Sequence, residues 1–307
     1  MRCLLFLFAI SLPVVIHAQP GSQEQQSLAK SLGEKVQRFE MWTDDAGNVT
    51  GLILINHQAL TKSVGMKPGI PDADLLKLTE FPKLTAVNFE AQPIGDAGLK
   101  VLSKFPNLKQ VGFHYMGKAK GAHASPDFIT VIDGMRDLEI IEIKHNFRMK
   151  AINVQKLKGS FPNVWRLVLD TPLTAEQTMH MIRLCPNVTD LQLHRTDVTA
   201  EQLAEIGELL PRLEVLWLKV KGGLQSGHLN AMKAFERLKI FSTQSFKTQV
   251  AYAEGWNVLG ELPNLRRLEI AGNPGEINSK AIKQLARTQS KIVVAEKLTR
   301  SRNYDGL

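Results

Sequence analysis

The stretch PNVTDLQLHRTDVTAEQLAEI, Pro186–Ile206, contains both halves of a repeated unit. Its first half, from Val188, has the spacing V-x-x-L-x-L, in which alternate residues fall on one side of a short strand. Its second half, from Val198, spaces apolar residues as on one stripe of a helix, and Thr199 is the expected N-cap. The stretch therefore predicts a strand, a turn and a helix.

The strand pattern returns along most of the chain. Successive lines are 24 to 30 residues apart, counted between their first apolar residues. One such unit cannot bury its apolar face alone, so the repetition predicts units stacked around a continuous core. The first apolar residues of the eight lines are Leu84, Leu108, Leu138, Val164, Val188, Leu213, Leu238 and Leu265.

The spacing L-x-x-L-x-L at this period resembles the leucine-rich repeat family. The phrase IGDAGLKVLSKFPNL, from Ile94, is similar to repeats of the helical, ribonuclease-inhibitor-like subclass found in exported bacterial members. The resemblance implies an α/β fold, a curved horseshoe with a parallel sheet on its concave face and helices on its convex face. It covers residues 49–295, about nine repeats. Many such repeats place an asparagine after the strand, but we predict that no line of this sequence does so. We expect T-x-[IV] turns, as at Thr171 and Thr196, in place of that asparagine.

The first eighteen residues have the layout of a secretory signal peptide. Arg2 precedes an apolar run, Leu4–Ile16, and the small residue Ala18 follows. We expect cleavage after Ala18, a secreted or periplasmic location and no transmembrane segment in the mature chain. A retained anchor is the alternative, which the shortness of the apolar run disfavours.

Two further segments flank the repeats. Residues 19–56 are expected to form an N-terminal cap, with a helix from Ser22 and then a hairpin. Residues 296–307 are a polar, basic tail. Cleavage would leave Cys185 as the single cysteine, so no internal disulfide is expected, and its apolar surroundings predict a buried side chain.

Alternation along each strand predicts which residues point to solvent from the concave face. The central strands place charged, polar and aromatic residues there, the mixture enriched at binding hot spots. The alternative is a solvated surface with internal salt bridges, in which neighbours partly cover the tryptophan. The candidate partner-binding residues are Arg166, Asp170, Asp190, Gln192, His194, Trp217 and Lys219.

His194 suggests catalysis when its stretch is considered alone. We expect it to contact Asp170 on the adjacent strand, but no serine or cysteine nucleophile is expected within reach of the pair. No G-x-S-x-G, phosphate-binding glycine loop or H-E-x-x-H occurs. We therefore predict no catalytic, cofactor-binding or metal site. The repeat histidines also lack the close spacing of zinc ligands: His114, His145, His194 and His228.

Two longer segments are additional candidates for binding. His114–Asp127 lengthens its repeat and carries basic residues on a glycine-rich stretch, and Ser245–Trp256 carries three aromatic residues. The alternative for the first is length variation that a solenoid tolerates. For the second it is aromatic packing within a distorted repeat.

These features favour a monomeric, non-catalytic recognition protein without a cofactor, which binds a protein partner or an envelope polysaccharide through its concave surface. A structural or assembly component of the cell envelope is the alternative. An intracellular adaptor of the ubiquitin-ligase type is a third hypothesis, against which the signal peptide argues. The formal net charge of +8 gives a weak bias toward anionic partners. The mixed signs on the concave face disfavour nucleic acid.

Overall fold

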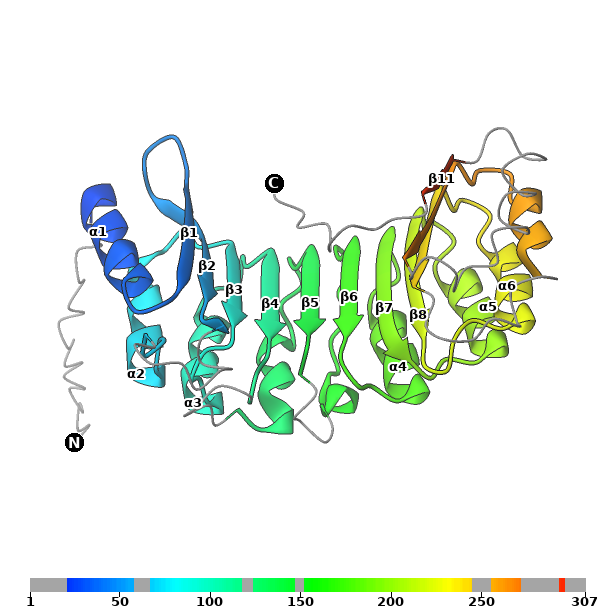
Figure 1. Cartoon of the computed structure of the whole chain (residues 1–307). Coiled ribbons are helices and arrows are strands. Elements are labelled where there is room, and N and C mark those ends of the chain that lie inside the picture. Colours follow the sequence, from blue (N-terminus) through cyan, green and yellow to red (C-terminus); the bar gives the residue numbers. More distant parts are fainter. Residues whose placement is uncertain are drawn as a thin grey trace, which may run out of the picture.

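A computed structural model describes residues 21–57, 67–117, 124–146, 152–244, 255–271 and 293–295. Its strands form one eleven-stranded sheet in which spatial order equals sequence order. The row of strands bends into an open arc with helices along its outer side (Figure 1). The fold is the expected leucine-rich repeat solenoid, with a parallel sheet on one face and helices on the other. The predicted signal peptide and C-terminal tail lie outside the described residues.

The sheet begins with one antiparallel pair and is parallel from there on. A hairpin joins the first two strands. Each later strand pairs in parallel with its neighbour, and the register shifts only once among these parallel pairs, between His194 and Thr196. The strands are β1 (Arg38–Thr43), β2 (Val49–Ile55), β3 (Ala86–Glu90), β4 (Gln110–His114), β5 (Ile140–Lys144), β6 (Arg166–Asp170), β7 (Asp190–Thr196), β8 (Val215–Val220), β9 (Ile240–Gln244), β10 (Arg267–Ala271) and β11 (Val293–Ala295).

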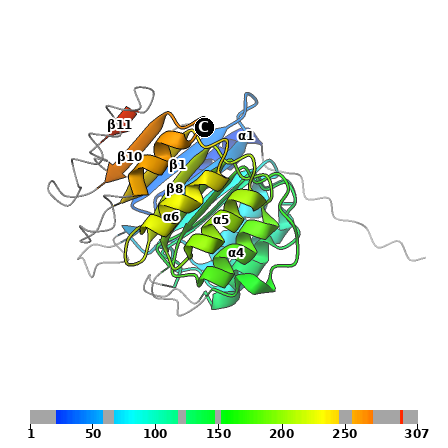
Figure 2. The same cartoon turned by 90° about the vertical axis from the view of Figure 1, so that its right-hand side faces the viewer.

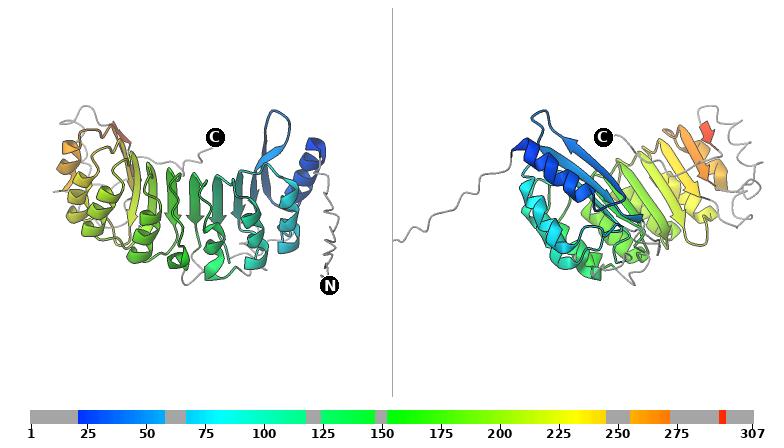
Figure 3. Two further views of the ribbon diagram at one scale, coloured as in Figure 1. Left: turned by 180° about the vertical axis from the view of Figure 1, so that it is seen from behind. Right: turned by 60° about the vertical axis from the view of Figure 1, so that its left-hand side comes forward.

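Helices follow the strands on the outer side of the sheet. Figure 2 shows α4, α5 and α6 stacked side by side there, and the views in Figure 3 show the same layering from behind and from the N-terminal side. The helices are α1 (Ser22–Gly33), α2 (Asp72–Leu75), α3 (Asp96–Leu99), α4 (Ala175–Leu184), α5 (Ala200–Leu209) and α6 (Ser226–Ala231), with 3-10 helices η2 (Leu76–Glu80), η3 (Lys100–Lys104), η4 (Pro126–Ile132), η5 (Val154–Lys156), η6 (Met232–Ala234) and η7 (Trp256–Glu261).

The outer helices are less regular than the sequence predicts. Only α4 and α5, among the helices that the structure describes after β2, reach 10 residues, whereas the segment after β4 forms the 3-10 helix η4. That segment contains Pro126 at its start and then the β-branched run Ile129–Ile132, which lowers helix propensity. The predicted cap at Thr199 is confirmed: its hydroxyl accepts from the amide of Gln202 at 3.2 Å.

The core contains the apolar residues that the repeat spacing predicts. The first apolar residue of each of the eight lines is at most 2% exposed. Val49, Leu52 and Leu54 of β2 are fully buried too, so the hairpin shares the same core. α1 packs beside it, and its Gln25 side chain accepts a hydrogen bond from the amide of Val49 at 3.2 Å. Cys185 is buried, and burial raises the pKa of its thiol.

Polar side chains tie consecutive repeats together at the start of the strands. Three asparagines of the P-N turns, Asn163, Asn187 and Asn264, donate to a backbone carbonyl of the preceding repeat. Asn163 donates to Arg136 at 3.1 Å, and Asn187 donates to Pro162 at 2.9 Å. On the helix side, buried Gln177 reaches back to the carbonyl of Ile152 at 2.9 Å.

The prediction that no repeat carries an asparagine after its strand is wrong. Asn146 lies three residues after the last core residue of β5 and is fully buried. Its side chain accepts from the amide of Met116 at 2.5 Å and donates to the carbonyl of Phe113 at 3.0 Å. Gln92 is equally buried after β3 and donates to the carbonyl of Leu54 at 2.9 Å. Buried amide side chains therefore connect the repeats that contain β3 and β5 to the repeats before them, whereas the T-x-[IV] turns were expected after β6 and β7, at Thr171 and Thr196.

Candidate functional site

The inner face of the sheet, formed by the side chains that alternate with the core, is more buried than the sequence predicts. Four of the candidates expected to face solvent are only 6–7% exposed, whereas His194, Trp217 and Lys219 are partly exposed. Neighbouring strands lie about 4.8 Å apart, so long polar side chains on adjacent strands cover one another. The four buried candidates are Arg166, Asp170, Asp190 and Gln192.

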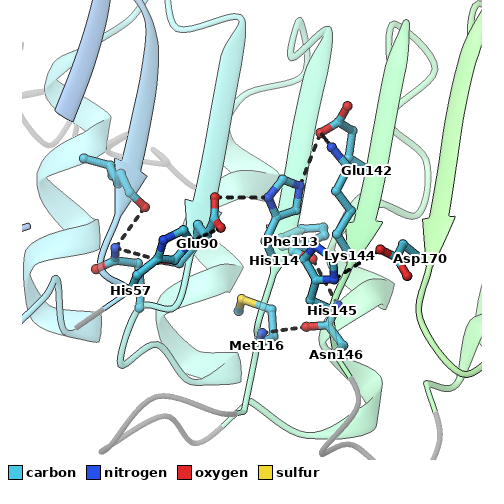
Figure 4. A network of polar contacts seen from close by, with 12 residues as sticks. His57, Glu90, Phe113, His114, Met116, Glu142, Lys144, His145, Asn146 and Asp170 are labelled. Atoms are coloured by element: carbon cyan, nitrogen blue, oxygen red, sulfur yellow. Dashed lines mark hydrogen bonds and ion pairs between the residues drawn. The ribbon is translucent and has the colours of Figure 1, made fainter. Parts of the chain in front are cut away.

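Histidines and carboxylates alternate along the edge of the inner face where the parallel strands end, here called the carboxyl edge (Figure 4). His57 contacts Glu90. His114 then lies between two carboxylates, with Nδ1 3.5 Å from Glu90 and Nε2 3.2 Å from Glu142. Lys144 also lies close to Glu142, at 2.6 Å.

Asp170 is the next carboxylate along this edge. The sequence-based expectation that it contacts His194 is confirmed, with Nδ1 of His194 3.4 Å from the carboxylate. The same oxygen lies 3.1 Å from Nδ1 of His145, which the sequence analysis did not connect to this row. Burial is the largest single effect on Asp170 and acts to raise its pKa. The hydrogen bond from His194 and the charges of the two histidines and Arg195 together outweigh burial, so the pKa of Asp170 is lowered. Asp170 therefore contacts two histidines, one directly after β5 and one on β7.

His145 reaches the carboxyl edge because of an unusual backbone conformation. Tyr115, His145 and Arg195 each directly follow the last inner-facing residue of a strand, and their φ angles are 56°, 58° and 57°. A left-handed conformation is costly for residues other than glycine and is common at functional sites. It lets the following residue, such as Asn146, turn into the core, while the three side chains stay partly or fully exposed. Strand alternation alone assigns them to the core, so sequence analysis missed them.

Arg166 connects the middle of the inner face. Its guanidinium lies 3.2 Å from Glu142 on β5 and 3.8 Å from Asp190 on β7. Burial raises the pKa of Asp190 despite the charge of Arg166. Burial also acts to raise the pKa of Glu142, but His114 and Lys144 outweigh it and lower that pKa. The candidate Arg166 is therefore a buried bridge between two strands rather than an exposed contact.

The most accessible of the predicted site residues lie on β7 and β8. His194 packs against Trp217, with ring centroids 4.4 Å apart, and pairs in register with Lys219. Arg195 follows His194 and is exposed. Burial and the charge of Arg195 lower the pKa of Lys219. An aromatic ring and two cations therefore meet at this end of the row.

A separate hollow of about 260 Å³ lies at the opposite end of the strands, where β2 to β5 begin. Its lining includes Gly51, Ala86 and Ile140 of the sheet and Trp42 of the hairpin. Trp42 is 38% exposed and lies against Gly51, since a Cβ there would come within 2.4 Å of its ring. The absence of a side chain at Gly51 thus leaves room for the tryptophan.

The other candidates have structural positions or lie partly outside the described residues. His228 is buried in α6, where its Nδ1 accepts from the amide of Gln225 at 3.1 Å and its Nε2 lies 3.1 Å from the carbonyl of Val198. Trp256 is 1% exposed and packs in the core. Residues 118–123 of the first longer segment and residues 245–254 of the second are outside the described residues.

The described residues present no metal-binding group and no membrane span. No three or more histidine, cysteine, aspartate or glutamate side chains among them are placed to hold a metal ion. None of the helices within the described ranges combines the length and apolar character needed to cross a bilayer.

The acid response of the carboxyl edge is a first testable property. Burial acts to raise the pKa of Glu90, but His114 and His57 outweigh it and lower the pKa from 4.5 to about 2. A carboxyl whose pKa is depressed by folding stabilises the protein above its unfolded pKa, and this stability is lost as the pH falls from about 4.5 to about 2. A tenfold change in proton affinity corresponds to about 1.4 kcal/mol, so the ionised Glu90 should contribute about 3 kcal/mol to the free energy of unfolding at neutral pH.

Urea unfolding at pH 7 and at pH 2.5 measures this contribution. Glu90→Gln should lower the free energy of unfolding at pH 7 and lose less stability than the unaltered protein on acidification. Glu139→Gln, at an exposed carboxylate paired with Lys109, is the control and should leave the acid dependence unchanged. Equal acid dependence in all three proteins would show that Glu90 is not held by the histidines.

Comparisons with known proteins add the following similarities. No protein-family model matches the chain, and no curated protein matches its sequence. Among solved structures, the chain is similar to the leucine-rich repeat-containing protein LegL7 from Legionella pneumophila, with 14% identity and a TM-score of 0.40, over 79% of this chain and 90% of that one. It is also similar to TLR13 in a complex with ssRNA13, with 14% identity and a TM-score of 0.33, over 76% of this chain and 43% of that one.

Proposed function

We propose that this chain is a non-catalytic recognition protein that binds a protein partner through the inner face around β7 and β8. The observation that supports this most is the packing of His194 against Trp217, at a ring distance of 4.4 Å, beside Lys219. Tryptophan is among the residue types that most often dominate binding energies at interfaces.

The network behind these residues favours binding by holding them in place. Asp170 fixes His194, and His194 in turn supports Trp217. Side chains that are already ordered lose little conformational entropy when a partner binds, which increases affinity for a given contact area. The buried candidates Arg166, Asp190 and Gln192 therefore act in this proposal as supports for the contact residues.

We also propose that the protein acts outside the cytoplasm, after export directed by residues 1–18. The support is the sequence of that segment, an arginine followed by a short apolar run and Ala18. Mass spectrometry of the protein purified from its native cells tests this. A mature N-terminus at Gln19 supports export, and a chain that keeps Met1 and remains in the cytoplasm contradicts it.

Replacement of Trp217 with alanine should weaken partner binding at least tenfold, because a buried aromatic contact at an interface is worth about 2 kcal/mol or more. The matched control is Trp165→Ala, which removes a tryptophan that is 36% exposed just before β6, outside the inner-face positions. The measurement is quantitative capture of a cross-linked partner from an extract of the native cells by each variant.

The same experiment distinguishes the alternative in which the protein is a structural component of the cell envelope. That alternative uses the edges of the solenoid or the basic tail, residues 296–307, so capture would survive Trp217→Ala. Undiminished capture by this variant, with a folded circular-dichroism spectrum in all three proteins, would exclude the proposed function.

A further inference from the structure

The hollow of about 260 Å³ at the beginning of the sheet is lined by one residue from each of the first five strands. These residues pair in register from strand to strand, in the order Trp42, Gly51, Ala86, Gln110 and Ile140. Figure 1 shows the five strands side by side. Because neighbouring strands lie about 4.8 Å apart, the row is about 19 Å long. The hollow therefore belongs to an extended row that can follow a chain-like ligand.

The row has an aromatic ring next to its smallest side chains. Gly51 pairs with Ala86, and the ring of Trp42 lies so close to Gly51 that a Cβ there would come within 2.4 Å of it. Trp42 is nevertheless 38% exposed. An exposed indole beside small side chains offers a flat apolar surface with space for a second ring.

The lining also contains an amide group that can hydrogen-bond a ligand. Gln110 is half-buried, and its side-chain carboxamide has no hydrogen-bond partner within the described part of the chain. A carboxamide both donates and accepts hydrogen bonds. A purely apolar ligand would displace water from this group without replacing its hydrogen bonds, which costs affinity. A ligand with hydroxyl groups can replace them.

The charges at the hollow are paired. Lys109 and Glu139 both line it and lie 2.7 Å from each other, whereas the other lining residues are uncharged. Nearby, Lys83 lies 3.1 Å from Asp44. A nucleic acid gains its affinity mainly from cations that neutralise its phosphates, and these two lysines already have carboxylate partners. The hollow therefore favours a neutral ligand.

We propose that this hollow binds a neutral sugar residue of an oligosaccharide, with a face of the pyranose ring against Trp42 and hydroxyl groups hydrogen-bonded to Gln110. A pyranose ring has C–H bonds on its faces and hydroxyl groups around its edge, so it matches both the indole and the amide. Further sugar residues follow the row toward β5. The inference uses β1 to β5, and it does not rest on the function proposed for β7 and β8.

Isothermal titration calorimetry of the full chain tests the proposal with two neutral probes, cellotetraose and chitotetraose. Tetrathymidylate and N-acetyltryptophanamide represent nucleic acid and an apolar side chain. Trp42→Ala removes the ring, Ala86→Leu fills the hollow while Trp42 stays in place, and Gln110→Leu replaces the amide with an apolar group. The control is Trp165→Ala, at a tryptophan that is 36% exposed and is not part of the lining. Urea unfolding midpoints confirm that each variant is folded.

At least one tetrasaccharide should bind with a Kd of about 1 mM or tighter, and more tightly than tetrathymidylate and N-acetyltryptophanamide. Trp42→Ala and Ala86→Leu should each weaken it about tenfold and Gln110→Leu about fivefold, whereas Trp165→Ala should change it by less than about twofold. The inference is overturned if neither tetrasaccharide binds or if either other probe binds more tightly. Unchanged binding by folded Ala86→Leu, or an equal loss in Trp165→Ala, would also overturn it.

Discussion

Replacement of Arg166 with methionine is expected to lower the free energy of unfolding by about 3–5 kcal/mol, the usual cost of removing one partner from a buried ion pair. The guanidinium bridges Glu142 on β5 and Asp190 on β7, and all three side chains are at most 10% exposed. Without it, both carboxylates lose a counter-charge in surroundings that water scarcely reaches. Methionine retains the apolar stem, so the loss reports the charge. Urea denaturation at neutral pH measures it.

Two comparisons make the Arg166 result specific. Arg183→Met, on the exposed surface of α4, breaks a pair with Glu205 at 2.6 Å and should cost less than about 1 kcal/mol, because the solvent screens exposed pairs. Combining Arg166→Met with Asp190→Asn should recover part of the lost stability, because Asp190 is then no longer a buried charge without a partner, whereas Glu142 keeps its contacts with Lys144 and His114. If the single variant were as stable as the unaltered protein, the inner face would not be the buried network described above.

Replacement of Asn146 with alanine is expected to lower the free energy of unfolding by about 3 kcal/mol. The side chain is fully buried, and it hydrogen-bonds to the amide of Met116 and the carbonyl of Phe113 in the preceding repeat. Each buried backbone group left without a hydrogen-bond partner costs about 1–3 kcal/mol. The unfolding midpoint in urea should therefore fall clearly for this one substitution.

Asn163→Ala is the matched control for Asn146. It also removes an asparagine that links two repeats, but its hydrogen bond to Arg136 is exposed and water can replace it. Its expected cost is about 1 kcal/mol or less. Equal losses for the two variants would indicate that burial of the Asn146 contacts does not contribute to stability.

The fold was largely predictable because the apolar spacing fixes both the strand and its stacking. Leu191 and Leu193 point into the core, and their counterparts on β6 and β8 pair with them in register. The asparagine position was missed for a physical reason. A left-handed residue such as His145 changes the side on which later residues fall, so simple alternation fails at the end of the strand.

The candidate site was predictable only in part. Alternation gave the direction of Asp170 and His194 and hence their contact, but not the burial of Arg166 or Gln192. Burial on the inner face depends on how side chains of neighbouring strands cover one another, which no single repeat specifies. The row of four histidines and three carboxylates likewise required the register of six strands to be known.

The most direct test of the central claim, that the inner face near β8 binds the partner, is photocrosslinking from two positions. A benzophenone side chain is introduced at position 221, directly after β8, or at position 205 on the outer surface of α5, where the native side chains are both exposed. The account predicts that position 221 crosslinks a protein partner in native cells and that position 205 does not. A partner crosslinked from position 205 and absent from position 221 would contradict it.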